Sequence, residues 1–281
     1  MGNPLDDKKI GFIGAGAMAE ALASALVASG FPKDRLAASD PDPARREIFE
    51  GSLGISISED NNDAVAESDI VVVAVKPDKV RSTLTRVKGD PERPLWISIA
   101  AGVTLDRLKA ALSASARIVR AMPNTPAKVH AGATGFCPSS TAKEADVEAA
   151  RALFESVGTV WQAPSEDLLD AVTGVSGSGP AYVFLFIEAL ADAGVRQGLP
   201  RAAAHALASQ TVFGAAKLVI ESGTHPALLK DRVASPGGTT IAGLERLEAG
   251  GLRAAIFQAV EAATQRSRGL RGPDQPGKGP R

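Results

Sequence analysis

Six consecutive residues near the N-terminus have the types and spacing of a phosphate-binding turn. The segment Gly14-Ala15-Gly16-Ala17-Met18-Ala19 follows an apolar run over residues 9–13 and precedes an Ala- and Leu-rich run that extends to Ser29. Gly14 permits a sharp turn out of a strand, and Gly16 lacks a Cβ, so the backbone can approach a pyrophosphate closely. A helix starting here presents free N–H groups to the phosphates. The alternative is a tight turn in an α/β fold that binds no nucleotide.

A second group of residues suited to anion binding lies far along the chain. Two glycines and two threonines occur together in Ser235-Pro236-Gly237-Gly238-Thr239-Thr240, just before a segment with a helical pattern. Free N–H groups at a helix start and neighbouring hydroxyls can hold a carboxylate or a phosphate. The alternative is that Thr239 and Thr240 only cap the helix, a common role of threonine.

The elements that must position the first group alternate between strand and helix. We expect strands at residues 36–39, 55–58, 70–75, 95–99 and 117–121, with two more at 132–137 and 159–162. Small or turn-forming residues follow three of them, in Lys76-Pro77, Ala100-Ala101-Gly102 and Met122-Pro123-Asn124. Ligands of open α/β sheets bind at the carboxyl ends of the strands. The pattern therefore predicts a Rossmann-type doubly wound α/β sheet with a dinucleotide across this edge.

The choice between NADPH and NADH depends on the residues after the second expected strand. Ser39 ends that strand and Asp40 follows, where an acid usually binds the ribose 2′-hydroxyl of NAD and repels the 2′-phosphate of NADP. Arg45 and Arg46 lie just beyond and are candidates for holding a 2′-phosphate. The alternative is that Asp40-Pro41-Asp42-Pro43 caps the next helix and both arginines are solvated. The sequence leaves the two interpretations open.

Composition narrows the classes of function. The chain has 281 residues and a formal net charge of −1, with no basic block for a nucleic-acid partner. A single cysteine, Cys137, excludes a disulfide within the chain and favours a cytoplasmic location. The N-terminus has no apolar signal core, and the apolar run at 181–187 is too short to span a bilayer, so we expect no membrane partner. The three histidines lack metal-ligand spacing, and we expect no metal site.

The second half of the chain has a helical pattern throughout. We expect a dinucleotide-binding domain at residues 1–164, an all-α domain at 165–270 and a disordered Pro- and Gly-rich tail at 271–281. Residues 183–190 are apolar nearly all round, and a helix of this kind is buried on every side. A small helical domain has too little core for that, so we expect a partner subunit to cover it.

A set of motifs together resembles the pyrroline-5-carboxylate reductase family. They are Phe12-Ile13-Gly14-Ala15-Gly16, Ala74-Val75-Lys76-Pro77, Ala100-Ala101-Gly102-Val103, Met122-Pro123-Asn124-Thr125-Pro126, Asp170-Ala171-Val172-Thr173-Gly174, Ser176-Gly177-Ser178-Gly179-Pro180-Ala181-Tyr182 and Ser235-Pro236-Gly237-Gly238-Thr239-Thr240. The last two are the most specific. The resemblance implies a Rossmann domain followed by a helical dimerisation domain. It also implies an active site between the nicotinamide of one subunit and the loop at 235–238 of its partner. The chain departs from the family at Asp40, where a small polar residue is common.

The resemblance also implies a reaction and its site. NADPH or NADH would deliver a hydride to the C=N bond of 1-pyrroline-5-carboxylate and give L-proline, the final step of proline biosynthesis. The implied assembly is a homodimer or a higher homo-oligomer, with a decamer among the candidates. Candidate cofactor-binding residues are Gly14, Ala15, Gly16, Ala17, Met18, Ser39, Asp40, Asn61, Ala74, Val75, Lys76, Pro77, Ala100, Ala101 and Asn124. Candidate substrate-binding residues are Ser235, Gly237, Gly238, Thr239 and Thr240, and Thr240 is the catalytic candidate because its hydroxyl can hydrogen-bond the ring nitrogen.

Two other functions compete with this interpretation. A 3-hydroxyacid dehydrogenase-like oxidoreductase needs a lysine on the first helix of its second domain, and residues 181–194 contain none. A dinucleotide-sensing regulatory protein has no need for a second anion-binding loop at 235–240. For single residues, Asn61 and Asn124 can cap helices or turns instead of contacting the cofactor. Lys76 can be a catalytic amine, although its place before Pro77 favours a backbone contact.

Overall fold

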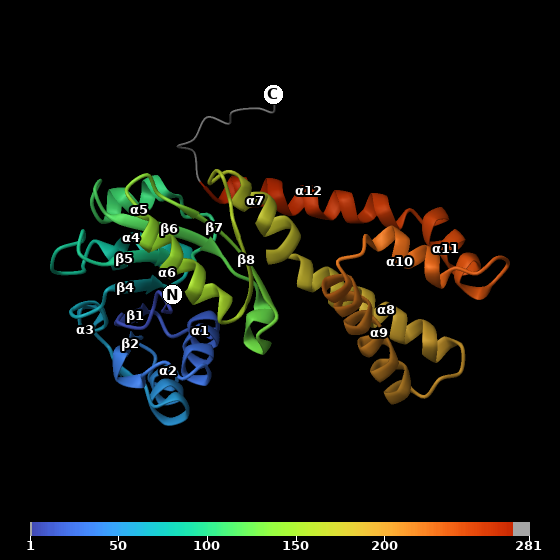
Figure 1. Cartoon of the computed structure of the whole chain (residues 1–281), viewed down its shortest axis with the longest axis horizontal. Coiled ribbons are helices and arrows are strands. Elements are labelled where there is room, and N and C mark those ends of the chain that lie inside the picture. The colour runs from blue at the N-terminus through green and yellow to red at the C-terminus, as the bar shows by residue number, and fades with distance from the viewer. Residues whose placement is uncertain (1, 272–281) are drawn as a thin grey trace. The chain divides into compact units, whose positions relative to one another are not determined.

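The computed structural model describes residues 2–271, which form two compact units (Figure 1). Among the described residues, one unit contains those at 2–177 and 262–271, and the other is Ser178–Glu261. The first unit thus extends beyond Pro164, since Leu169 is buried there with Cys137 and Ala163. Of the tail expected at 271–281, Arg271 is described, and the rest lies outside the described residues.

An eight-stranded sheet forms the centre of the first unit, in the order β3-β2-β1-β4-β5-β6-β7-β8. The strands are β1 (Ile10–Ile13), β2 (Leu36–Ser39), β3 (Ser56–Ser58), β4 (Ile70–Val73), β5 (Leu95–Ser98), β6 (Arg117–Met122), β7 (Gly132–Pro138) and β8 (Gly158–Gln162). Neighbouring strands pair in parallel except β6 and β7, which are antiparallel. The strand order reverses between β1 and β4, which is where open α/β sheets bind ligands.

Helices cover both faces of this sheet, and each face has its own core. On one face lie α1 (Ala17–Ala28) and α6 (Glu144–Glu155), whose Leu22 and Phe154 are buried with Phe12 and Val72. On the other face lie α3 (Asn61–Val65), α4 (Pro77–Leu84) and α5 (Leu105–Ala111), which are buried against Val71, Val73 and Trp96. Helix α2 (Pro43–Glu47) follows β2. The predicted Rossmann-type sheet is confirmed, and every expected strand is present within a residue or two of its expected bounds.

The second unit is built from helices alone, as expected. Its helices are α8 (Gly179–Arg196), α9 (Arg201–Ser222), α10 (Pro226–Val233), α11 (Thr239–Ala249) and the first part of α12 (Leu252–Leu270). Helices α8 and α9 pack through small buried side chains, Ala191, Ala204 and Ala208.

Most large apolar side chains of the second unit are exposed, with Phe184 at 63% and Phe257 at 77%. Two helical runs, Leu168–Arg196 of 29 residues and Arg201–Ser222 of 22, are long and apolar enough to cross a membrane by length and composition alone. The first helical run, Leu168–Arg196, is much longer than the apolar run at 181–187 on which the sequence-based expectation was based.

Candidate active site

The glycine turn between β1 and α1 has the geometry that its sequence predicts. Gly14 adopts a positive φ of 91°, and a Cβ on it would lie 2.9 Å from the carbonyl oxygen of Ala74. Gly16 is the N-cap of α1, with no side chain capping the helix. A Cβ added to Gly16 would meet nothing closer than the Ala74 oxygen at 4.0 Å. The space beside Gly16 and the first N–H groups of α1, at Ala17 and Met18, is therefore open to a ligand.

The other candidate cofactor residues follow strands whose last residues pair with one another. Ile13 at the end of β1 pairs with Ser39 on one side and Val73 on the other, and Val73 pairs with Ser98. The segments that follow these strands carry Asp40, Ala74, Val75, Lys76, Pro77, Ala100 and Ala101. The structure thus brings them to one edge of the sheet, at the reversal of strand order.

Asn61 and Lys76 occupy helix starts at this edge. Asn61 is the first residue of α3, whose N-cap is Asp60, and its Oδ1 accepts a hydrogen bond of 2.8 Å from the Ser39 hydroxyl. Lys76 is the N-cap of α4, with an exposed side chain that makes no capping hydrogen bond. Asn61 therefore does not cap α3, and the backbone of Lys76 directs the chain out of the sheet.

Asp40 holds the glycine turn. Its Oδ2 accepts a hydrogen bond of 2.8 Å from the N–H of Ala15, and its Oδ1 accepts one of 2.9 Å from the N–H of Asp42. The cap of α2 is Asp42, which accepts a hydrogen bond of 2.9 Å from Ala44. The segment does cap the next helix, as one interpretation expected. The capping residue is Asp42, and Asp40 lies beside the glycine turn.

Asn124 connects three segments of the first unit. Its Nδ2 donates a hydrogen bond of 3.0 Å to the carbonyl oxygen of Ser176, and its Oδ1 accepts one of 2.9 Å from the N–H of Ala133. The side chain is 8% exposed. It therefore holds the end of β6 against β7 and against the π-helical turn Thr173–Gly177 that follows α7 (Leu168–Val172). Sequence reasoning did not anticipate this bracing role.

The loop between α10 and α11 in the second unit has a backbone that favours glycine at position 237. Gly237 has a φ of 66°, and the N–H of Gly238 donates to the carbonyl oxygen of Ser235 at 3.0 Å. A Cβ on Gly238 would lie 2.3 Å from the Ser235 hydroxyl oxygen. Gly238 is the N-cap of α11, so Thr239 and Thr240 are its first residues and neither occupies the capping position. Thr239 is exposed, and Thr240 is half-buried.

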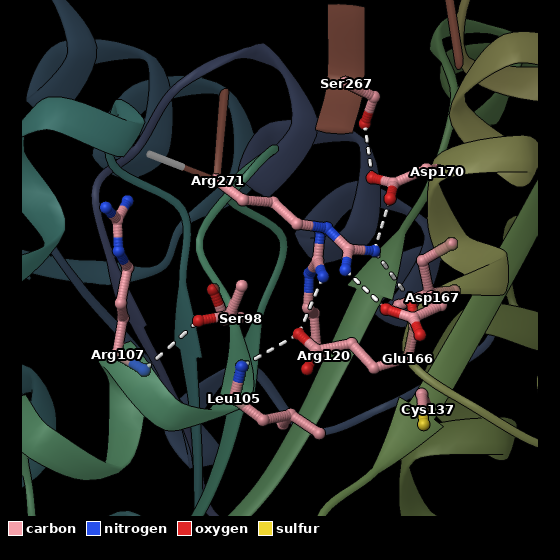
Figure 2. Close-up of polar contacts among 12 residues, drawn as sticks. Ser98, Leu105, Arg107, Arg120, Cys137, Glu166, Asp167, Asp170, Ser267 and Arg271 are labelled. Carbon is pink, nitrogen blue, oxygen red and sulfur yellow. Dashed lines mark hydrogen bonds and ion pairs between the residues drawn. The ribbon is translucent and has the colours of Figure 1, made fainter. Parts of the chain in front are cut away.

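A network of charged side chains ties the end of α12 to the first unit (Figure 2). The Arg271 guanidinium forms ion pairs with Asp170 and, at 2.5 Å, with Asp167, and the Ser267 hydroxyl donates to Asp170 at 2.7 Å. Burial alone would lower the pKa of Arg271, but the hydrogen bond to Asp167 and the surrounding carboxylates outweigh it and raise the pKa. The guanidinium therefore stays charged.

Next to this network, Glu166 joins β6 to the start of α5. One oxygen of its carboxylate accepts hydrogen bonds from the buried Arg120, at 2.7 Å, and from the N–H of Leu105, at 2.8 Å (Figure 2). Burial, followed by the charge of Glu166, raises the pKa of the nearby Cys137 thiol. Cys137 is therefore a packing residue, because a protonated thiol is a poor nucleophile.

The end of α12 also touches a loop that carries candidate cofactor residues. Gly102 follows Ala100 and Ala101, has a φ of 74°, and would place a Cβ 2.8 Å from the Cβ of Leu270. The last turn of α12 thus packs against the segment after β5. No motif marked this contact, because the two segments are far apart in the sequence.

Comparison with known proteins finds similarity over most of the chain. Residues 166–270 match the family model for pyrroline-5-carboxylate reductase dimerisation, and residues 9–102 match the model for the coenzyme F420-dependent NADP oxidoreductases. The pyrroline-5-carboxylate reductase of Synechocystis sp. is 48% identical over 93% of this chain and 98% of its own length.

Two solved structures extend the similarity to the fold. The pyrroline-5-carboxylate reductase of Coxiella burnetii superposes with a TM-score of 0.89 at 36% identity, covering 95% of this chain and 99% of the other. The pyrroline carboxylate reductase of Plasmodium falciparum, solved with NADP bound, gives a TM-score of 0.85 at 34% identity, with coverage of 95% and 99%. The chain belongs to the pyrroline-5-carboxylate reductase family.

Proposed function

We propose that the protein reduces 1-pyrroline-5-carboxylate to L-proline with NADPH or NADH, the final step of proline biosynthesis. The observation that supports this function is the loop at 235–240, where Gly237 has a positive φ and the exposed Thr239 and half-buried Thr240 begin α11, in a chain that also has an open glycine turn. We assign this loop to anion binding. A cyclic imine with a carboxylate needs both a reductant and an anion-binding loop. The family to which the chain belongs acts on this substrate.

The residues have distinct roles in this proposal. The turn at 14–18 holds the pyrophosphate through the N–H groups of Gly16, Ala17 and Met18, because those of Gly14 and Ala15 donate to Ser39 and Asp40. Asn61 contacts the adenosine, and residues 74–77 with Ala100 and Ala101 line the remaining cofactor site. Asn124 positions this edge through its bonds to Ser176 and Ala133. The bound cofactor supplies the hydride.

The substrate is held by the loop at 235–240. The backbone N–H groups around Gly237, Gly238 and Thr239, with the Ser235 hydroxyl, bind its carboxylate, which fixes the ring. The Thr240 hydroxyl then hydrogen-bonds the ring nitrogen: it accepts from the N–H of the protonated imine and can donate to the lone pair that appears on the nitrogen as the amine forms. A donor placed there stabilises the amine as it forms, and so contributes to the rate of the chemical step.

The same proposal includes self-association in the cytoplasm. The exposed apolar side chains of α8 and α12 belong to the segment that matches the dimerisation model, so we assign them to contacts between subunits of a homodimer or of a larger homo-oligomer such as a decamer. This assignment also accounts for the two long apolar helical runs without a membrane. A net charge of −1 gives no reason to expect a nucleic-acid partner.

The rival dehydrogenase interpretation lacks its catalytic group. Helix α8, the first long helix of the second unit, contains no lysine in its sequence from Gly179 to Arg196. A hydroxyacid dehydrogenase of this layout needs such a lysine to polarise its carbonyl or alcohol. The imine reductase needs none, because the protonated ring nitrogen is itself the activating charge.

A direct assay tests the proposal. Purified protein is mixed with 1-pyrroline-5-carboxylate and either NADH or NADPH, and cofactor oxidation is followed by absorbance while L-proline is measured by chromatography. We expect one proline for each reduced cofactor consumed. Cofactor binding without proline formation, with either nucleotide, would reject the proposed reaction. The Gly16→Val variant serves as the control for oxidation that does not depend on the bound cofactor.

A further inference from the structure

We propose that this chain prefers NADH to NADPH, and that Asp40 is the residue that sets the preference. The inference rests on the proposed function only in that the glycine turn must bind a nicotinamide dinucleotide. It concerns the end of β2, where the adenosine ribose of a Rossmann-bound dinucleotide lies. Three side chains after the end of β2 determine the choice of nucleotide: Asp40, Arg45 and Arg46.

The Asp40 carboxylate is fixed beside the glycine turn and keeps free acceptor positions. The N–H groups of Ala15 and Asp42 each donate to one of its oxygens, at 2.8 and 2.9 Å. A carboxylate has about four acceptor positions, so roughly two remain for the hydroxyls of a ribose. The side chain is half-buried, and the two hydrogen bonds hold it in place before any ligand arrives. A preorganised acceptor of this kind favours a ribose with a free 2′-hydroxyl.

The arginine that lies nearest the turn is already engaged. Arg45 donates from Nε to the carbonyl oxygen of Ala15 at 2.6 Å, and its guanidinium forms an ion pair with Glu20 at 2.6 Å. Arg45 and Asp40 thus hold the same peptide segment from its carbonyl and its amide sides. Moving Arg45 to a phosphate would release the turn that has to bind the pyrophosphate.

The second arginine is engaged as well. Arg46 donates to the carbonyl oxygens of Asp40 and Pro41, each at 2.9 Å, and forms an ion pair with Glu59 at 2.7 Å. Its side chain is 21% exposed, whereas a phosphate-binding arginine must direct its donors to the ligand. The neighbouring charges are therefore balanced without a phosphate. A 2′-phosphate arriving here meets the charge of Asp40 and finds both arginines already paired with carboxylates, Arg45 with Glu20 and Arg46 with Glu59.

The test measures cofactor binding without the imine, so that it is independent of catalysis. The full-length protein is titrated with NADH and with NADPH by calorimetry at fixed, low ionic strength. We expect a Kd for NADH about tenfold lower than that for NADPH, or lower still. Equal affinities, or tighter binding of NADPH, would overturn the inference and leave the proposed reaction intact. Failure to bind either nucleotide would instead contradict the proposed function.

Two variants of Asp40 identify it as the cause. Asp40→Asn keeps the shape and an acceptor for the Ala15 N–H but removes the charge, and Asp40→Ser also shortens the side chain. Both variants should reduce the preference for NADH at least severalfold, because they weaken the binding of NADH and strengthen the binding of NADPH. The control is Asp42→Ser, which removes a charge two positions away at the cap of α2 and should leave the ratio of the two Kd values unchanged. A ratio that stays constant in both Asp40 variants, with folding verified by circular dichroism, would refute the assignment.

Arg46 gives an independent check. If Arg46 were a phosphate ligand, Arg46→Ala would weaken the binding of NADPH and leave the binding of NADH unchanged. We expect instead that any loss is the same for both nucleotides, because Arg46 braces the loop and contacts no phosphate. Selective loss of NADPH affinity in this variant would contradict the inference.

Discussion

At Gly14 and Gly16, two glycines of one turn are required for different reasons. Gly14 has a φ of 91° and lies against the backbone of Ala74, so the protein itself needs glycine there. Gly16 has a φ of −67° and a ψ of 175°, which any residue adopts, and open space beside it. The fold therefore does not require glycine at position 16, whereas the proposed pyrophosphate would. A substitution at Gly16 can thus test binding without unfolding the turn.

We expect Gly16→Val to fold normally and to lose dinucleotide binding by about 100-fold or more. Its branched side chain would occupy the space of the pyrophosphate, while its backbone angles suit a β-branched residue. Calorimetric titration with NADH measures the loss, and the thermal midpoint measures the fold. Wild-type affinity in the folded variant would remove the glycine turn from the cofactor site. Gly14→Ala is the matched variant, and it should lower the thermal midpoint instead.

Thr240 is the residue at which chemistry and capping can be separated. The N-cap of α11 is Gly238, so truncating Thr240 should not cost the roughly 1 kcal/mol of a lost cap. We expect Thr240→Ala to lower kcat/KM for the imine by about 10²-fold, since a hydrogen bond that strengthens as the amine forms is lost. Thr240→Ser should keep most of the activity. Steady-state kinetics with a saturating cofactor decide the matter, and normal turnover of the alanine variant would assign the proton to another donor.

Among the elements, the last turns of α12 make contacts that the sequence of the helix does not predict. The helix starts in the second unit, and its last turns belong to the first unit, where Ser267 and Arg271 meet Asp170. Asp170 is 1% exposed, so its charge depends on these partners for compensation. Leu270 packs against Gly102 at the segment after β5. The contact therefore supports the loop that carries Ala100 and Ala101.

We expect Arg271→Met to reduce the free energy of unfolding by about 3 kcal/mol, because it leaves the Asp170 carboxylate buried without its cation. Methionine keeps most of the aliphatic length of the side chain. The double variant Arg271→Met with Asp170→Asn should recover part of the loss, since the unpaired charge is then absent. Unfolding in guanidinium chloride measures the free energy of unfolding of both variants. An unfolding free energy within about 0.5 kcal/mol of the wild type would show that the ion pair contributes nothing to stability.

Sequence reasoning located the strands and the glycine loops but not the contacts that brace them. Apolar runs such as Ile70–Val73 are local signals, and so are the glycines, because a positive φ is a property of a single residue. The pair of Ser267 with Asp170 spans 97 positions and that of Arg271 with Asp167 spans 104. Nothing local marks such partners. The same reason explains why Asn124 was interpreted as a contact or a cap, when its amide joins segments that only the fold brings together.

For the whole molecule, the second unit is incomplete without a partner. Its buried apolar core consists of small residues, Ala191, Ala204 and Ala208, with Ile187 and Val195 packed against them. Phe184, Leu185, Ile220 and Phe257 remain between 63% and 80% exposed. Burying one such side chain gains roughly 1.5–3 kcal/mol, so a second copy that covers several of them accounts for a stable dimer. The match of residues 166–270 to the dimerisation model supports a second copy of this chain as the partner that buries these side chains.

We expect the wild-type protein to sediment as a dimer or a larger assembly at micromolar concentration, and Phe184→Glu to shift it towards monomers with loss of activity. A carboxylate at that position of α8 would have to be desolvated in the interface, which costs several kcal/mol when no cation pairs with it. The matched control is Val129→Glu, which places the same charge on an apolar position of the first unit that is 72% exposed, against 63% for Phe184, and should leave the assembly unchanged. Circular dichroism separates dissociation from unfolding, because a folded monomer keeps its helical signal. An active wild-type monomer, or a Phe184→Glu assembly of unchanged size, would show that α8 is covered by something other than a second copy of this chain.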